Sequence, residues 1–215
     1  YPESVVAFDC PTNGKQWVRQ VFLELGHIDI RWAGAVSTGS ADDSTTNYTA
    51  INKCVVLGSA FARVYVPKGE FYVSNTGLSI PDDTHIYGAG WRNAKLVFGV
   101  GPNVPIATDS AGAGAGDGGC NNFVMEDLYL DFSNATAGES IRLLICNYFR
   151  LERLYIYDFS DYGIVTMGAT YGEIVNNIFE EGGTYNAILI GETNSEIRSH
   201  NVIISHNLIN GGTTM

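Results

Sequence analysis

Acidic and aromatic residues recur at a regular spacing in the second half of the sequence, and together they suit chemistry on a carbohydrate. Aromatic rings pack against the apolar faces of sugars, and paired carboxylates can serve as the acid and base of glycoside cleavage. The candidate substrate-binding residues are Tyr129, Tyr155, Tyr157, Phe179 and Tyr185. The candidate catalytic residues are Asp131, Asp158, Asp161, Glu180 and Glu181.

This spacing comes from an internal repeat. Residues 122–131 align with residues 148–157, which places Phe149 26 positions after Phe123 (149 − 123 = 26). Later copies pass through Ile178, at 24 positions from Leu154, and through Leu208, 30 positions further on. Periods of this length with two or three short strands each predict the coils of a parallel β-helix, in which a coil buries its apolar face only against its neighbours.

Stacked coils convert the repeat into columns of side chains, because strands of neighbouring coils lie about 4.8 Å apart. The predicted columns are Leu128, Leu154 and Ile178 inward, Tyr129, Tyr155 and Phe179 outward, and Asp131, Tyr157 and Glu181 facing solvent. Two coils would separate Asp131 from Glu181 by roughly 10 Å, near the upper limit for inverting glycosidases. The alternative is a solvated face whose aromatic ladders only stabilise the fold.

Short apolar runs separated by turn residues fill the segment 64–90. The runs 64–66, 71–73, 78–80 and 85–87 alternate with Pro, Gly, Asn and Asp, a pattern typical of short strands and tight turns. The order V-x-V-P-x-G-x-[FY]-x-V, followed by I-x-G-x-G, resembles the start of right-handed parallel β-helices of the pectate lyase superfamily. That group includes phage tailspikes, polygalacturonase-like enzymes and fungal exo-glucanases, and the resemblance covers roughly residues 28–98.

A helix is expected to close the open end of the first coil. Residues 42–57 are similar to the family's acidic entry followed by a helix, although Thr38-Gly39-Ser40 replaces the family's first Asp-Gly. Asp43 or Ser44 can cap this helix, and capping explains the acidic pair better than a metal site does. The residues expected on its buried face are Tyr48, Ile51, Cys54 and Val55.

The sequence divides into a lead-in segment, residues 1–33, and a β-helix domain, residues 34–215. Within the lead-in, residues 16–25 show helical spacing and are either a helix or an irregular cover for the fold. Residues 102–119 are rich in Gly and Ala and are expected to form a loop on the side of the coil. Because the chain does not begin with Met and shows no capping element at its end, we expect a processed or partial product.

Composition limits the partners. The formal net charge of −11 repels the phosphate backbone of nucleic acids, and it disfavours polyuronates unless Ca²⁺ bridges the carboxylates. No cofactor is expected, and no cluster of Ca²⁺ ligands is evident. No apolar run approaches the roughly 20 residues of a membrane span.

The cysteines and two glycosylation sequons favour an extracellular protein, a virion surface included. Cys120 and Cys146 differ by one repeat, so we expect them to stack and form a disulfide, with Cys10–Cys54 as the second pair. The rival is a ladder of reduced thiols in the core. The expected glycan acceptors are Asn47 and Asn134.

Two functions fit these observations. The resemblance implies a glycoside hydrolase or polysaccharide lyase-like protein that acts on or binds a polysaccharide. The alternative is a non-catalytic structural or adhesive subunit of a fibre, spike or coat, in which copies form an oligomer or filament. The family's sharper catalytic motifs are mostly absent: Glu180-Glu181 stands where an acidic pair might, but His206 is not in a G-H-G motif and no R-x-K occurs.

Overall fold

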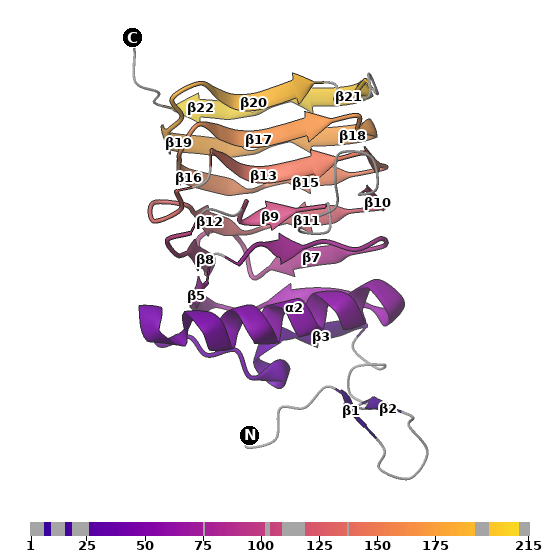
Figure 1. Cartoon of the computed structure of the whole chain (residues 1–215), viewed down its shortest axis with the longest axis vertical. Helices are drawn as coiled ribbons and strands as arrows, with labels where there is room; N and C mark the ends of the chain where they lie inside the picture. Colours follow the sequence, from indigo (N-terminus) through magenta and orange to yellow (C-terminus); the bar gives the residue numbers. More distant parts are fainter. Residues whose placement is uncertain are drawn as a thin grey trace.

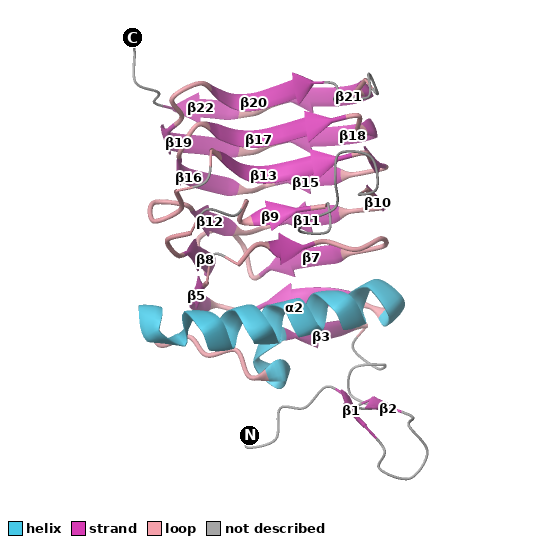
Figure 2. Ribbon diagram, viewed as in Figure 1, coloured by secondary structure: helices cyan, strands magenta, loops and turns pink. Residues whose placement is uncertain are grey.

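The chain folds into a right-handed parallel β-helix closed at one end by a helix (Figures 1 and 2). This computed structural model describes residues 7–9, 16–18, 26–74, 76–101, 104–108, 119–136, 138–191 and 198–210. Successive coils stack along the long axis of the molecule, from indigo at the helix to yellow at the C-terminal end in Figure 1.

Each coil contributes strands to three parallel sheets. The first sheet contains β3 (His27–Asp29), β4 (Arg63–Val66), β7 (His85–Gly88), β10 (Cys120–Asn121), β11 (Val124–Glu126), β14 (Cys146–Asn147), β15 (Arg150–Glu152), β18 (Thr170–Val175) and β21 (His200–Ser205). The second contains β5 (Gly69–Val73), β8 (Ala94–Phe98), β12 (Tyr129–Asp131), β16 (Tyr155–Phe159), β19 (Ile178–Gly182) and β22 (Leu208–Asn210). The third contains β6 (Leu78–Ser79), β9 (Ile106–Ala107), β13 (Glu139–Leu144), β17 (Tyr162–Met167) and β20 (Asn186–Gly191).

Corners between strands are made by single residues in the left-handed backbone conformation. One such column runs through Asp127, Arg153, Asn176 and His206, all with φ between 52° and 59°. The amides of the first three donate to carbonyls of the next coil: those of Glu152, Val175 and Ser205. A left-handed residue bends the chain sharply at one position, so short strands can turn a corner without a crossover helix.

The core is a set of inward columns along the axis. In the second sheet Phe71, Leu96, Leu130, Ile156 and Phe179 pair in register and are almost fully buried. In the first sheet the ring of Phe149, on the preceding coil, fills the space beside Gly172, where a Cβ atom on that glycine would lie 1.9 Å from a ring carbon. These inward side chains supply the apolar burial that no coil achieves alone.

A buried amide ladder replaces apolar packing at one corner. Asn177, 1% exposed, accepts a hydrogen bond from the Leu154 backbone N–H and donates to the Leu151 carbonyl, at 2.9 and 3.0 Å. Asn207 on the next coil accepts from both the backbone and the side-chain N–H groups of Asn177. The ladder explains one error: the inward partner of Leu154 is Asn177, and Ile178, predicted to point inward, pairs with Tyr155 and faces outward.

The predicted plug is helix α2 (Ser44–Phe61), which lies across the open end of the first coil in Figure 1. Ile51, Cys54 and Val55 on its inner face are at most 1% exposed, as expected. Asp43 occupies the N-cap position of α2, as one of the two expected candidates, but its side chain makes no capping bond; Ser40 caps the preceding 3-10 helix η2 (Ala41–Asp43). Within the described residues no helix has the length and apolarity to cross a membrane.

Two other expectations about the chain need correction. Residues 16–18 form strand β2, which pairs antiparallel with β1 (Ala7–Asp9), so the helical reading of 16–25 fails there; residues 19–25 lie outside the described part. Strand β9 (Ile106–Ala107) lies within the region 102–119 expected to be a loop, and it pairs with β6 and β13. A further 3-10 helix, η1 (Ile30–Ala33), follows β3.

The two sequons differ in the fold. Asn47 is 0% exposed, its side-chain oxygen accepts from the Val36 N–H at 2.7 Å, and its nitrogen donates to the Tyr72 carbonyl at 2.9 Å. The expected glycan at Asn47 is therefore wrong, because the amide nitrogen is used in joining α2 to β5. Asn134 is exposed in the turn after β12 and stays a predicted acceptor.

Cys120 and Cys146 stack as predicted. They pair in register between β10 and β14, both are buried, and their Sγ atoms lie 2.9 Å apart without a bond. The contact between the two sulfurs, together with burial, raises the pKa of the Cys146 thiol. Cys54 is a buried free thiol whose pKa burial raises to about 12, and Cys10 lies outside the described residues.

The first prediction concerns this pair. Under oxidising conditions we expect Cys120 and Cys146 to form a disulfide, since their sulfurs are already in contact, and the closed loop is worth roughly 3–4 kcal/mol in the chain-entropy model. Non-reducing peptide mapping would recover one linked peptide containing both residues. A C120S/C146S variant is the control, and free thiols throughout the oxidised protein would instead assign the pair to a reduced core ladder.

Candidate functional site

The outward face of the second sheet carries two columns that hold most of the predicted site. The first column runs Glu70, Lys95, Tyr129, Tyr155, Ile178 and Leu208. The second runs Tyr72, Val97, Asp131, Tyr157, Glu180 and Asn210. Side chains alternate along each strand, so both columns point away from the core while the column between them fills it.

Aromatic rings form a continuous stack at the centre of this face. The rings of Tyr129 and Tyr155 lie 4.6 Å apart between centroids, and Trp91 stacks on Tyr155 at 5.2 Å with an interplanar angle of 13°. Tyr157 approaches Tyr129 at 6.0 Å in a tilted arrangement. Trp91 lies in the turn between β7 and β8 and is partly exposed, so it extends the stack toward the edge of the sheet.

Lys95 connects the aromatic and the acidic parts of the face. Its Nζ lies 2.8 Å from a carboxylate oxygen of Asp131, 3.9 Å from Glu70 and 4.9 Å from the centre of the Tyr129 ring. Burial raises the pKa of Asp131, but hydrogen bonds from Lys95 and Ser133 outweigh it and leave that pKa below its usual value. Asp131 is therefore held as a carboxylate, which makes it a poor proton donor.

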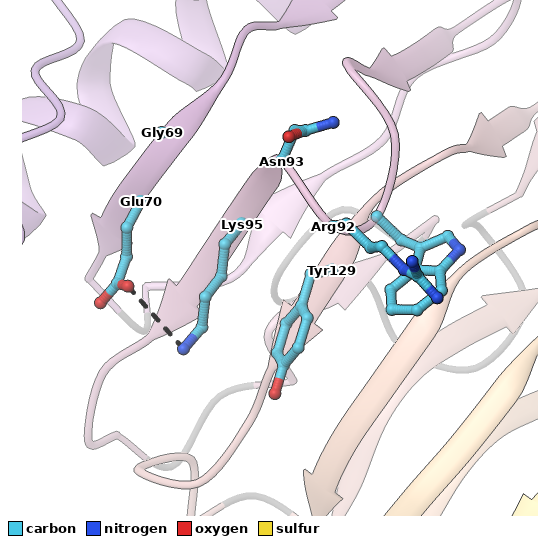
Figure 3. A pocket seen from close by; sticks show the side chains of 7 residues that line it. Gly69, Glu70, Arg92, Asn93, Lys95 and Tyr129 are labelled. Carbon is cyan, nitrogen blue, oxygen red and sulfur yellow. Dashed lines mark ion pairs between the residues drawn. The ribbon is translucent and has the colours of Figure 1, made fainter.

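A hollow opens beside the stack, with a volume of about 370 Å³ (Figure 3). Its lining residues are Gly69, Glu70, Trp91, Arg92, Asn93, Lys95 and Tyr129. Figure 3 shows Glu70, Lys95 and Tyr129 side by side on successive strands, with Arg92 and Asn93 on the turn above them. The Arg92 guanidinium lies 4.7 Å above the Trp91 ring and, within the described residues, forms no ion pair. One apolar wall and several hydrogen-bonding groups thus meet at this point.

Two further carboxylates lie at the other end of the face. Tyr157 donates a hydrogen bond from its hydroxyl to Glu181 at 2.9 Å, and this bond raises the pKa of Tyr157. Register places Asp158 beside Glu181 on the next coil, and both have left-handed backbones with φ of 50° and 51°. Because the same left-handed conformation occurs at the same level of both strands, the two carboxylate-bearing positions stay in register.

Outward columns exist as predicted, but three of the residues assigned to them lie elsewhere or are buried. Phe179 is 0% exposed and pairs with Ile156 in the core, so its substrate-binding role is wrong. The position opposite Tyr157 belongs to Glu180, and Glu181 reaches the column only through its side chain. Asp131 was predicted to face solvent, but its side chain is buried, with 6% of the residue exposed.

Asp161 and Tyr185 lie away from the aromatic stack, at the turns that lead from the second sheet into the third. The Asp161 carbonyl accepts from the Tyr185 amide at 3.1 Å, and the ring of Tyr185 stacks on Tyr162 at 5.3 Å. The structure therefore separates Asp161 and Tyr185 from the other candidate residues on the outward face of the second sheet. Those that it brings together there are Tyr129, Tyr155, Tyr157, Asp131, Asp158, Glu180 and Glu181.

Sequence reasoning missed Trp91, Lys95 and Glu70. Glu70 and Lys95 are 25 positions apart, within the repeat range, but Lys95 and Tyr129 are 34 apart (129 − 95 = 34) because residues 102–119 lengthen that coil. Because this spacing lies outside the repeat range, the sequence did not show that Lys95 and Tyr129 share a column. The strand pattern of 94–98, in which Lys95 is the polar residue of an apolar run, was the available signal.

The described residues hold no group of three or more His, Cys, Asp or Glu side chains placed to bind a metal ion. Near the aromatic stack, Asp131 is paired with Lys95, and Glu181 accepts a hydrogen bond from Tyr157.

Comparison with known proteins supports the fold. No protein-family model matches the sequence, and no curated protein matches it. Among solved structures, ORF18 of Geobacillus virus E2 is similar over 98% of this chain, with a TM-score of 0.66 and 13% identity. The pre-mature gene product 12 of bacteriophage phi29 matches 89% of the chain with a TM-score of 0.52 and 18% identity. The A-module of a mannuronan C-5 epimerase from Azotobacter vinelandii matches 84%, with a TM-score of 0.50 and 18% identity.

These likenesses establish the right-handed parallel β-helix as the class of protein to which the chain belongs by fold. The chain spans only part of each neighbour: 46% of the Geobacillus virus protein, 34% of the phi29 protein and 56% of the epimerase module.

The second prediction tests the role of Lys95. A Lys95→Met variant keeps the aliphatic stem but removes the ammonium group, so burial should dominate and the pKa of Asp131 should rise from its lowered value. NMR titration of the side-chain carboxyl carbons measures this change. Lys68→Met, at an exposed position elsewhere, is the matched control. An Asp131 pKa that does not move in K95M would contradict the pairing.

Proposed function

We propose that the protein binds a glycan along the outward face of the second sheet, with the chain lying beside Trp91, Tyr129 and Tyr155. The observation that carries the proposal is the partly exposed aromatic stack bordered by the hollow at Arg92, Asn93 and Lys95. A sugar offers an apolar face to the rings and hydroxyl groups to the polar side chains, and this arrangement accommodates both.

The repeated coils of the fold favour an elongated ligand. Equivalent positions recur on each coil at about 4.8 Å, so the face presents repeated contacts along one line, and a polymer with repeating units can use several of them. Among the fold neighbours, the mannuronan epimerase is named for a polysaccharide. Two others are phage proteins, and we therefore propose a location outside the cell, at a virion surface, with the copies assembled as a homo-oligomer.

The third prediction concerns Trp91. A Trp91→Ala variant should weaken glycan binding by about tenfold or more, because it removes the ring that borders the hollow. Isothermal titration with short oligosaccharides of α-glucan, β-glucan and mannuronate is the measurement. Trp91→Phe should retain most of the affinity, and Lys53→Ala on the exposed side of α2 should not change it.

Equal affinity of W91A and the parent protein would place the glycan elsewhere. If the parent protein binds none of these oligosaccharides, the glycan-binding function itself fails and the structural-subunit alternative takes its place.

A catalytic role is the second candidate, and the juxtaposition of Asp158 and Glu181 favours it. Carboxylates on neighbouring coils start from backbones about 4.8 Å apart, which is closer to the spacing of retaining than of inverting glycosidases. The partnership of Glu181 with the Tyr157 hydroxyl also gives one carboxylate a fixed orientation.

The fourth prediction follows from this arrangement. If an oligosaccharide that binds is also cleaved, Glu181→Gln and Asp158→Asn should each lower turnover by about a hundredfold or more, the usual effect of losing an acid, base or nucleophile. Glycan affinity should be preserved in both variants. Product release measured by chromatography decides the matter, and unchanged turnover in both variants would exclude this pair.

A further inference from the structure

A second corner column contains residues whose types do not suit their backbone conformation. The residues of this column occupy the same corner on successive coils, and all have a left-handed backbone with φ between 53° and 58°. They are Asp83, Asn122, Tyr148, Tyr171 and Asn201. The amides of Asp83, Asn122 and Tyr148 donate to carbonyls of the next coil at 2.8 to 2.9 Å, so the backbone is the same at each level.

The fold requires the left-handed conformation at this corner, but it does not require tyrosine there. Asn and Asp enter the left-handed region most readily among residues with a side chain, and they occupy three of the five levels. A bulky ring is disfavoured in this region, and such residues collect at ligand-binding and active sites. Two adjacent tyrosines therefore point to a function for the rings themselves.

The two rings form an exposed platform. Tyr148 and Tyr171 stack at 5.3 Å with an interplanar angle of 11°, yet they are 59% and 54% exposed. The level below Tyr148 carries Asn122, a shorter side chain whose amide is turned to Asp83 at 2.7 Å. The outer face of the Tyr148 ring therefore meets no other ring among the described residues.

Hydrogen-bonding groups border the platform. The ring of His200 meets Tyr171 edge-on at 6.1 Å, and its Nδ1 contacts the Arg198 carbonyl, which leaves Nε2 available. The exposed amide of Asn201 occupies the next level of the column. Flat rings with an imidazole and an amide beside them match a sugar: an apolar face flanked by hydroxyl groups.

This platform is separate from the face already described. Strands β10 and β18, which belong to this edge of the first sheet, lie at the right side of the solenoid in Figure 1, whereas β8, β12 and β16 lie at the left. A ligand on one side does not touch the other.

We propose that Tyr148 and Tyr171, with His200 and Asn201, form a second glycan-binding site. The inference rests on the proposed function for the class of its ligand, while its location rests on the corner column alone. Two sites on opposite sides would let one molecule hold two stretches of a polysaccharide, which raises its apparent affinity for a surface coated with glycan.

The test is a double variant that suits the backbone, Y148N/Y171N. Asparagine fits the left-handed corner, so the variant should unfold at the same temperature as the parent or higher, whereas a purely stabilising ring ladder would lower it. Retention on an affinity gel of immobilised glycan should fall by about tenfold or more, and titration with the same short oligosaccharides should show one bound ligand per chain where the parent shows two. Y148F/Y171F keeps the rings and should retain most of the binding.

Comparison with W91A separates this inference from the proposed function. Binding lost in W91A but unchanged in Y148N/Y171N overturns the second site and leaves the first. Binding lost in Y148N/Y171N supports the second site whatever the result for W91A, and a parent protein that binds no oligosaccharide defeats both. A lowered unfolding temperature, or a changed oligomeric state with unchanged glycan binding, would assign the tyrosines to fold stability or to a contact between copies, and overturn the proposal.

Discussion

The hydrogen bond from a left-handed corner residue to the next coil is the constraint on which this structure depends. Where a left-handed residue forms the corner, the chain turns at a single position and the amide of that residue joins the coil above, as Asp127 does with Glu152. The cost of the left-handed conformation recurs at each level, so the corners are stable only while inward columns such as Leu130 and Ile156 stay packed. Register between coils is thereby fixed along the whole solenoid, and it decides which side chains share a column.

Fixed register explains how one face concentrates polar groups in an acidic protein. Lys95 is placed between Glu70, one coil below, and Tyr129, one coil above, and it reaches Asp131 across the strand. Lys95 places a positive charge beside the aromatic stack in a protein whose net charge is −11. The pair keeps Asp131 ionised, so the acid–base candidates shift to Glu181 and Asp158, where the strand ends and no lysine intervenes.

Sequence alone predicted the coils, the plugging helix and the stacked cysteines, because apolar periodicity and turn residues report them directly. It failed where a polar residue occupies an inward position or where a coil changes length. Buried Asn177 broke the apolar pattern and shifted the alignment by one residue, which sent Phe179 to the wrong side. The Gly- and Ala-rich stretch was read as a loop, so β9 was not predicted. Its length also changed the spacing between Lys95 and Tyr129, so their common column was not recognised. Asn47 matched a sequon, but tertiary hydrogen bonds consume its amide.

Stacked aromatic residues are expected on any solenoid, since neighbouring coils bring identical positions to stacking distance, so a stack by itself does not indicate a ligand. The three tyrosine stacks differ in what accompanies them. Tyr129 and Tyr155 are bordered by Trp91, two cations and a hollow, which a stabilising ladder does not need. Tyr148 and Tyr171 occupy backbone positions that favour asparagine, and they stay exposed. Tyr185 is also exposed, but its stack with Tyr162 lacks both the bordering groups of the first stack and the left-handed backbone of the second, and stabilisation of the turns between the second and third sheets accounts for it. The context of each stack, rather than the stacking, therefore distinguishes the two stacks proposed to bind a glycan from the third.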